Sequence, residues 1–417
     1  DAFTKERVRD QYANRFKIHF PGEEREAGRP LRKRPAFQFQ KELGGVFGLN
    51  YGWEHPLYFD FDTPDTAGFT RQDWWKSVRR EALLLRQNVG IIDISNFGKY
   101  LCRGDGAYEF LDSIFANKIP KNVGASCLSP IIGKMGGIAA DATITKLSDD
   151  SFWIVSSGAA EGFQQRFYNL VKRGKGTEFI SKSEDYCGFN VAGPKSRELL
   201  QRLSNKDLSN EAWPFFKSGS LIIAGVECLA MRVSFTGDLG WELYCEKHNQ
   251  LALYKLLIEN ASQIGGGPVG SRALMSLRLE KGYGSWGREY SPEYWPHEVG
   301  LERLIANKPN FINKNEVESV LALPAREQLV VLKLNEADVR KSNADALGGE
   351  PIFKDGNGIG RVTSGGYGYS VNMSLALGFV KGIESGEEVD VMVLGKPHKA
   401  TVLSEPPFDP ESSILRS

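Results

Sequence analysis

Apolar residues in the first half of the chain alternate between helical and strand-like spacing. Asp73, a candidate N-cap, precedes the segment WWKSVRREALLLRQNVG, whose apolar positions recur at helical spacing and stop at Gly90. This pattern predicts a helix. The next expected elements are, in order, a strand at 91–103, a helix at 106–115 and strands at 136–147 and 152–156. A helix between a strand and a hairpin is typical of an α+β unit.

The same succession returns further along the chain. It predicts a strand at 187–192, a helix at 195–203, strands at 219–224, 227–235 and 241–245, and a helix at 249–263. The recurrence indicates two α+β units built on one supersecondary design.

From residue 327 onward the spacing becomes purely strand-like. Short β-like runs separated by Gly, Asn and Asp turns lie at 329–334, 359–363, 376–380, 388–393 and 399–403. They predict a small β-barrel or sandwich. The first sixty residues differ from both regions, because a dense charge run at 23–34 precedes an aromatic-rich stretch at 47–59. We expect an extended arm there.

Composition narrows the class of protein. The length of 417 residues suits two or three globular units of roughly 100–200 residues each. Lys plus Arg (52) equals Asp plus Glu (52), so no global field attracts nucleic acid or an anionic membrane. No apolar run approaches the ~20 residues that span a bilayer. We therefore expect a soluble protein with neither nucleic-acid nor membrane partners.

The cysteines and histidines indicate no metal. The five cysteines are scattered without a C-x-x-C pair, and the five histidines form no H-E-x-x-H motif. A reducing compartment is the default expectation. The chain begins at Asp1 without a signal pattern, which suggests a fragment, a processed chain or one product of a longer precursor.

Three local features combine charge with unusual surroundings. Asp141 is a lone acid in the apolar run GGIAADATI, where it either starts the strand or faces a ligand. Glu242 follows a glycine turn in SFTGDLGWELY, and its alternating context favours solvent exposure. Arg272, Arg278 and Glu280 share a predicted helix, where a solvated charged face is the simpler interpretation.

A fourth feature, Gly282 to Gly287, matches G-x-G-x-x-G but follows a helix rather than a strand, so a dinucleotide site is rejected. Pattern alone indicates a multidomain protein with two unusual carboxylates and no particular reaction.

Several of these segments resemble a known family. GGIAADATI and RVSFTGDLGWELY resemble, in the right order, two segments of the glycine-cleavage aminomethyltransferases. Further matches are SLRLEKGY with SWG, PHEVGL, NFI and TSGGYGYSVNMSLALGFV, and together they cover about residues 75–410. HFPGEEREAGRPLR and GGVFGLNYGWEHPLYF resemble the connector between the flavin and folate domains of dimethylglycine and sarcosine dehydrogenases.

The resemblance implies an α+β fold in which three domains form a ring around a folate channel. Two interleaved domains of mixed α and β structure would precede a C-terminal β-barrel. The expected limits are an arm at 1–60, one domain from 61–92 with 180–265, a second from 93–179 with 266–315, and the barrel at 316–417.

It also implies roles for individual residues. Glu242 matches the glutamate that binds the pterin, because one carboxylate can accept two adjacent N–H donors. Asp141 matches the catalytic aspartate, which would stabilise a developing cation. The remaining expected cofactor-binding residues are Trp153 and Phe235 on the pterin face, Trp286, and Arg272 for the anionic end of the folate.

The sequence departs from the family's pattern at several positions. Ala140 replaces the first aspartate of an Asp-Asp pair, and Gly133 replaces an asparagine. Anchoring on LRLE places the family's arginine at Leu274, so Arg272 fits only with a shifted helix start.

The implied function is one-carbon transfer. The methyl-derived carbon of dimethylglycine or sarcosine would be captured on tetrahydrofolate as 5,10-methylenetetrahydrofolate. FAD would belong to a flavin domain or subunit outside these residues, in contact with the arm, and the setting would be the bacterial cytoplasm or the mitochondrial matrix. Two alternatives stay open: a stand-alone folate-dependent N-, O- or S-demethylase, and a non-catalytic scaffold or regulatory relative.

Overall fold

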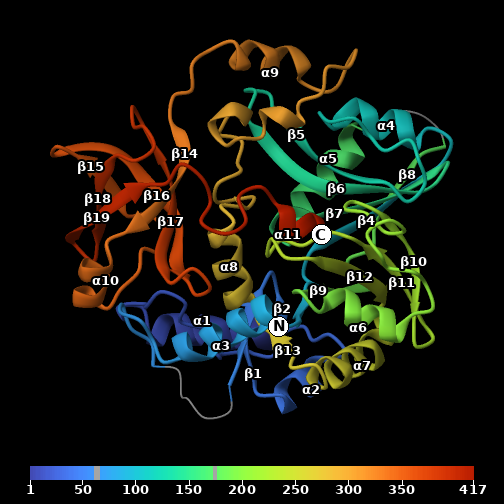
Figure 1. Ribbon diagram of the computed structural model, residues 1–417, viewed down its shortest axis with the longest axis horizontal. Helices are drawn as coiled ribbons and strands as arrows, with labels where there is room; N and C mark the ends of the chain where they lie inside the picture. The colour runs from blue at the N-terminus through green and yellow to red at the C-terminus, as the bar shows by residue number, and fades with distance from the viewer. Residues whose placement is uncertain (61–65, 172–175) are drawn as a thin grey trace.

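The computed structural model describes residues 1–60, 66–171 and 176–417. Figure 1 shows three parts arranged as a ring: a closed β-barrel on the left, a five-stranded sheet at the upper right and a six-stranded sheet at the lower right. The α+β ring with a C-terminal barrel is therefore confirmed. No helix within the described ranges has both the length and the apolarity needed to cross a membrane.

The six-stranded sheet carries two helices on one face. Its order is β10 (Ser218–Ile223), β11 (Val226–Met231), β12 (Gly240–Glu246), β9 (Tyr186–Ala192), β3 (Gly90–Asp93) and β13 (Gly267–Val269). α6 (Ser196–Leu203) and α7 (Gln250–Ser262) pack their apolar side chains against it. Trp241 and Leu243 of β12 belong to this core, so β12 is covered from this side.

The five-stranded sheet is antiparallel throughout. Its order is β5 (Ser126–Ile132), β6 (Ile138–Ser148), β7 (Ser151–Ser156), β4 (Gly98–Arg103) and β8 (Glu178–Ser181). α4 (Ala107–Ile114), η1 (Gly158–Ala160) and α5 (Glu161–Val171) follow its strands. Ala140, Ala142 and Ile144 of β6 face the core that these helices cover.

One predicted strand is wrong. The segment 91–103 was expected to be continuous, but it divides into β3 and β4, which belong to different sheets. The amide of Phe97 donates to the carbonyl of Ile94 at 3.1 Å, which closes a turn between them. β3 then pairs with β9 and β13, whereas β4 pairs with β7 and β8. The chain thus crosses between the two sheets after only four residues of β3.

The C-terminal region is a barrel rather than a sandwich. Its strands close in the order β14 (Gln328–Leu334), β17 (Met373–Val380), β16 (Asn357–Gly368), β15 (Pro351–Lys354), β18 (Glu388–Val393) and β19 (Lys396–Val402). α9 (Lys314–Leu321) precedes it, α10 (Glu336–Ser342) follows its first strand, and α11 (Ser413–Arg416) ends the chain. The remaining short helices are η2 (Lys247–Asn249), η3 (Pro296–Glu298) and η4 (Glu302–Leu304).

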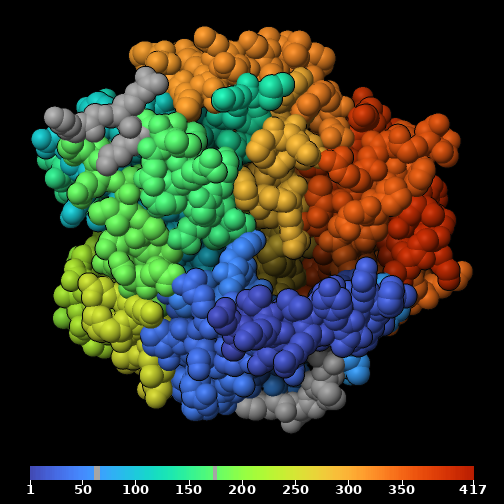
Figure 2. Space-filling model, turned by 180° about the vertical axis from the view of Figure 1, so that it is seen from behind, coloured from blue at the N-terminus to red at the C-terminus, as the bar shows by residue number. Residues whose placement is uncertain are grey.

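The N-terminal region is not the extended arm that the charge run predicted. It contains α1 (Ala2–Ala13), α2 (Phe37–Glu42) and the hairpin of β1 (Gly45–Asn50) with β2 (Trp53–Phe59). β2 is largely buried, whereas α1 buries none of its residues. Figure 2 shows the N-terminal residues lying across the face opposite to that of Figure 1.

Two helices lie between the barrel and the six-stranded sheet: α8 (Ser271–Glu280) contacts strands of both, and α3 (Trp74–Gln87) packs against α8. The solvated face predicted for α8 is wrong, since Arg278 and Glu280 are fully buried. Arg278 pairs with Glu289 at 3.2 Å, and Glu280 pairs with Arg86 of α3 at 2.8 Å. Buried charges of this kind require such partners, so α8 is fixed by ion pairs on its polar side.

Candidate functional site

Glu242 lies on β12 between two strands of the six-stranded sheet. In register it stands opposite Met231 of β11 and Asn190 of β9. Its exposed fraction is only 8%. The solvent exposure predicted from alternation is therefore wrong: helices cover one face of β12, and the core shared with the five-stranded sheet covers the other. Because this strand is buried on both faces, the alternation of polar and apolar residues does not indicate a solvent-exposed side.

The Glu242 carboxyl group accepts a hydrogen bond from a neighbouring tyrosine. The hydroxyl of Tyr244, two residues along the same strand face, donates to its Oε2 at 2.6 Å. Burial raises the pKa of Glu242 to about 7, and the bond from Tyr244 acts in the opposite direction. Near neutral pH the carboxyl group therefore titrates, and it becomes an acceptor for further donors once it is ionised.

Asp141 lies on β6, on the opposite face from its apolar neighbours Ala140 and Ala142. The cross-strand partners of Thr143 and Thr145, which share the face of Asp141, are Val155 and Trp153 of β7. The Oδ1 of Asp141 is buried without a hydrogen-bond partner among the described residues. Burial raises its pKa to about 6. The strand-initiating interpretation is therefore insufficient, because a buried unpaired oxygen costs stability.

The sheet face that carries Glu242 and the sheet face that carries Asp141 both border the layer between the two sheets. The rings of Trp153 on β7 and Tyr244 on β12 lie 6.0 Å apart, centroid to centroid, and both belong to the apolar cluster between the sheets. Trp153 shares its sheet face with Asp141, and Tyr244 shares its face with Glu242. The two acids thus project into the same layer from opposite sides. The indole Nε1 of Trp153 is also buried without a partner among the described residues.

Two further predicted residues lie at the margin of this layer. The Nε1 of Trp286 donates to the carbonyl of Ala139 at 3.0 Å, two residues before Asp141. The ring of Phe235 stacks on Tyr283 with centroids 6.0 Å apart. Both rings are partly buried. Their contact with a folate stays a prediction.

Arg272 has a different environment. Its guanidinium group lies over the ring of Trp74 at 4.3 Å and donates to the carbonyl of Gly22 at 3.1 Å. It lines a cavity of about 400 Å³ together with Asp345 and Tyr367 from the barrel region. The structure therefore does not bring Arg272 to the cavity that Trp153 and Tyr244 line.

That second cavity measures about 850 Å³. Besides the two rings, it is lined by four lysines, which are Lys146, Lys182, Lys206 and Lys217. Glu242 and Asp141 do not line either of these two cavities.

Sequence reasoning missed two residues of this site. Tyr244 follows Glu242 by two positions, which places it on the same face of a strand. Asn190 is the one polar residue in the run FNVA of β9, the same kind of signal that drew attention to Asp141. The spacing from Glu242 could have indicated Tyr244, and the rule that singled out Asp141 could have indicated Asn190.

Comparison with known proteins identifies the family. The model of the GCVT N-terminal domain matches residues 36–308, and that of the glycine cleavage T-protein C-terminal barrel domain matches residues 328–409. The chain belongs to the GCVT family. A further model, the FAD dependent oxidoreductase central domain, matches residues 1–33 of this GCVT-family chain.

Individual relatives agree with this assignment. The chain is 33% identical to human mitochondrial dimethylglycine dehydrogenase over 97% of its length and 47% of the relative's. It is 27% identical to mouse mitochondrial sarcosine dehydrogenase over 99% of its length and 50% of the relative's. The predicted resemblance is confirmed, and the chain spans about half the length of these curated relatives.

A solved structure shows the same fold. The glycine cleavage system aminomethyltransferase T from Bartonella henselae superposes with a TM-score of 0.79 at 23% identity, covering 91% of this GCVT-family chain and 99% of the other.

Proposed function

We propose that this chain is the tetrahydrofolate-dependent one-carbon transfer part of an enzyme of the dimethylglycine or sarcosine dehydrogenase type. The observation that carries the proposal is a pair of carboxyl groups, buried Glu242 and half-buried Asp141, on the two sheet faces that border one layer. Similarity to the two dehydrogenases supports methylated amines as the source of the carbon. When bound, the reduced folate supplies the nitrogen atoms that accept this carbon as 5,10-methylenetetrahydrofolate.

The chemistry of the described residues fits a reduced pterin. Unpaired buried polar atoms in the layer, Asp141 Oδ1 and Trp153 Nε1, are an acceptor and a donor that a polar ligand could satisfy. Glu242 would accept the paired N–H donors of the pyrimidine edge, and the Tyr244 hydroxyl would hold that carboxyl group in position. Trp153, Phe235 and Trp286 would supply apolar ring surface.

Asp141 would contribute to the reaction through its negative charge rather than through the fit of the ligand. With a pKa raised to about 6 by burial, it is mostly ionised at neutral pH and can stabilise a cationic carbon centre or accept a proton from the attacking amine. Its Oδ1 is buried, and the lower effective dielectric constant there strengthens that electrostatic effect.

The flavin part of the reaction would lie outside these residues. The match of residues 1–33 to an FAD dependent oxidoreductase central domain supports a flavin domain or subunit that contacts the N-terminal region. Arg272 is proposed for the anionic end of the folate, which would then extend to the cavity beside Asp345.

Anaerobic calorimetric titration of the chain with tetrahydrofolate tests the proposal. Saturable binding at micromolar ligand is expected. No heat of binding at millimolar tetrahydrofolate would favour a non-catalytic relative. Turnover of methylated amines with tetrahydrofolate but without any flavin source would instead favour a stand-alone demethylase.

A further inference from the structure

Asn190 is the nearest polar neighbour of Glu242 across the sheet. The two residues are directly paired in the antiparallel register of β9 and β12, so their side chains leave the sheet on the same face. Directly opposed residues have Cβ atoms about 4.5–5.5 Å apart. The amide of Asn190 therefore lies beside the Glu242 carboxyl group.

The amide is incompletely bonded within the protein. The Asn190 side chain is 2% exposed, and its Nδ2 donates to the carbonyl of Trp241 at 3.4 Å. Its Oδ1 has no hydrogen-bond partner among the described residues. Nδ2 carries two N–H groups and the bond to Trp241 uses one of them, so the side chain still offers one donor and one acceptor. A buried acceptor without a partner destabilises the fold unless water or a ligand completes it.

The edge of a reduced pterin offers the complementary pair. Next to the N3–H and 2-amino donors that a carboxylate accepts, the ring presents N1, an acceptor, and N8–H, a donor. A carboxamide can bind both at once, donating to N1 and accepting from N8–H. A fully oxidised pterin has no hydrogen on N8, so it presents two adjacent acceptors, and a carboxamide can satisfy only one of them.

We propose that Asn190 is a specificity-determining residue that recognises the N1 and N8–H edge of a reduced pterin while Glu242 binds the pyrimidine donors beside it. This inference rests on the proposed function. A bound water on Asn190 Oδ1 is the competing account; it would satisfy the amide without giving any selectivity for the ligand.

The first test needs no variant. The chain is titrated anaerobically with tetrahydrofolate and with 8-deazatetrahydrofolate, in which a methylene group replaces N8–H. Wild type is expected to bind tetrahydrofolate about tenfold more tightly than 8-deazatetrahydrofolate. The deaza ligand loses one neutral hydrogen bond and leaves the Asn190 amide oxygen without a donor. Equal affinity for the two ligands would overturn the assignment of Asn190 and leave the proposed function intact. No binding of tetrahydrofolate would overturn both.

The second test assigns the preference to this side chain. Asn190→Leu keeps the volume but removes the amide, and we expect the two ligands to bind it within about twofold of each other. Glu242→Gln should bind both ligands more weakly but should still prefer the ligand that carries N8–H. Asn260→Leu, on α7 and away from the layer, is the matched control and should behave as wild type. A preference that survives in Asn190→Leu would contradict the proposal.

Discussion

The two sheets hold their carboxyl groups in different ways. On the six-stranded sheet, Glu242 accepts a hydrogen bond from Tyr244 on its own strand. On the five-stranded sheet, Asp141 leaves one buried oxygen unpaired among the described residues. A carboxylate fixed by its neighbour suits a binding role, since its orientation is set before a ligand arrives. An unpaired carboxylate can interact at full strength with a positive charge that develops during the reaction.

Asp141→Asn is expected to have the largest effect on the transfer reaction. The amide keeps the size of the side chain but removes its charge, so binding of tetrahydrofolate should be nearly unchanged while methylene transfer slows by ~10²-fold or more. Single-turnover kinetics with calorimetry separate the two effects.

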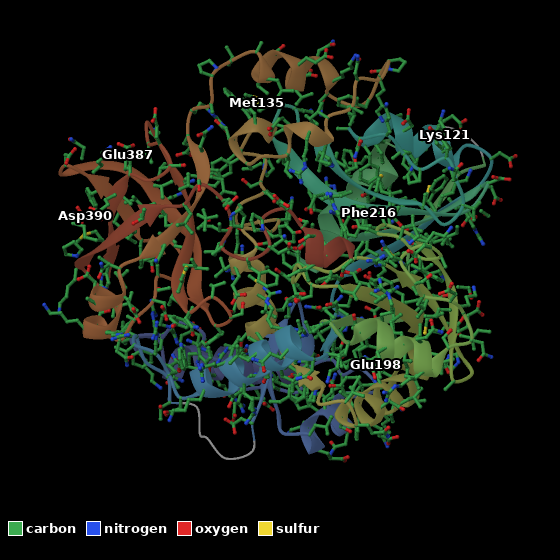
Figure 3. All side chains as sticks on the ribbon, in the orientation of Figure 1. Lys121, Met135, Glu198, Phe216, Glu387 and Asp390 are labelled. Atoms are coloured by element: carbon green, nitrogen blue, oxygen red, sulfur yellow. The ribbon has the colours of Figure 1, made fainter. Side chains whose placement is uncertain are left out.

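The matched control is Asp390→Asn, a carboxylate on the barrel that pairs with Lys399 (Figure 3). It should transfer at the wild-type rate. An Asp141→Asn protein with unchanged turnover would remove Asp141 from the mechanism.

Glu242→Gln tests the other half of the comparison. An amide can accept one of the two pterin donors but presents its own N–H to the other, so affinity for tetrahydrofolate should fall by roughly 10- to 100-fold. The rate at saturating ligand should change less. Glu198→Gln, an exposed carboxylate on α6, is the control (Figure 3). If both variants bind like wild type, Glu242 does not contact the pterin.

A pH series sharpens the difference between the two acids. The pKa of Glu242 is raised to about 7, so the acceptor form disappears as pH falls, and the affinity of wild type for tetrahydrofolate should drop about tenfold from pH 8 to pH 6. In Glu242→Gln this part of the dependence should vanish. A wild-type affinity that is flat over this range would contradict ionised Glu242 as the acceptor.

The same shift affects folding with the opposite sign. Because the folded chain holds the Glu242 proton more tightly than the unfolded chain, its contribution to stability is lost as pH rises from about 4.5 to about 7. At pH 8 the free energy of unfolding of Glu242→Gln should therefore exceed that of wild type by roughly 1–3 kcal/mol. The variant should unfold at a correspondingly higher temperature. Thermal unfolding at pH 8 measures this.

The sequence predicts most elements of the fold but not how they exchange between sheets. Periodicity located α3, α6, α7 and five of the six barrel strands, and it missed β15. It failed at residues 91–103, where the turn between β3 and β4 contains no proline and no positive-φ glycine. Pairing with distant strands, rather than local preference, divides that segment.

The site shows the same limit. Alternation misplaced Glu242, since it cannot distinguish a solvated face from one that packs on a second sheet. The burial of Arg278 and Glu280 was missed for a related reason: their partners Glu289 and Arg86 lie outside the helix, and Arg86 is 194 residues away from Glu280. Pattern singled out the two acids and resemblance to the family supplied their expected roles, whereas their relation through Trp153 and Tyr244 required the structure.

Tyr244→Phe should have the smallest effect and the most specific one. The substitution keeps the ring that packs against Trp153 but removes the hydroxyl that donates to Glu242. Since that bond lowers the pKa of Glu242, its loss should move the pH dependence of tetrahydrofolate binding upward by less than about one unit. Affinity at pH 8.5, where wild-type Glu242 is ionised, should fall only a few fold. A merely structural role for the hydroxyl would weaken binding equally at every pH and leave the midpoint in place, and that outcome would contradict Tyr244 as the residue that positions Glu242.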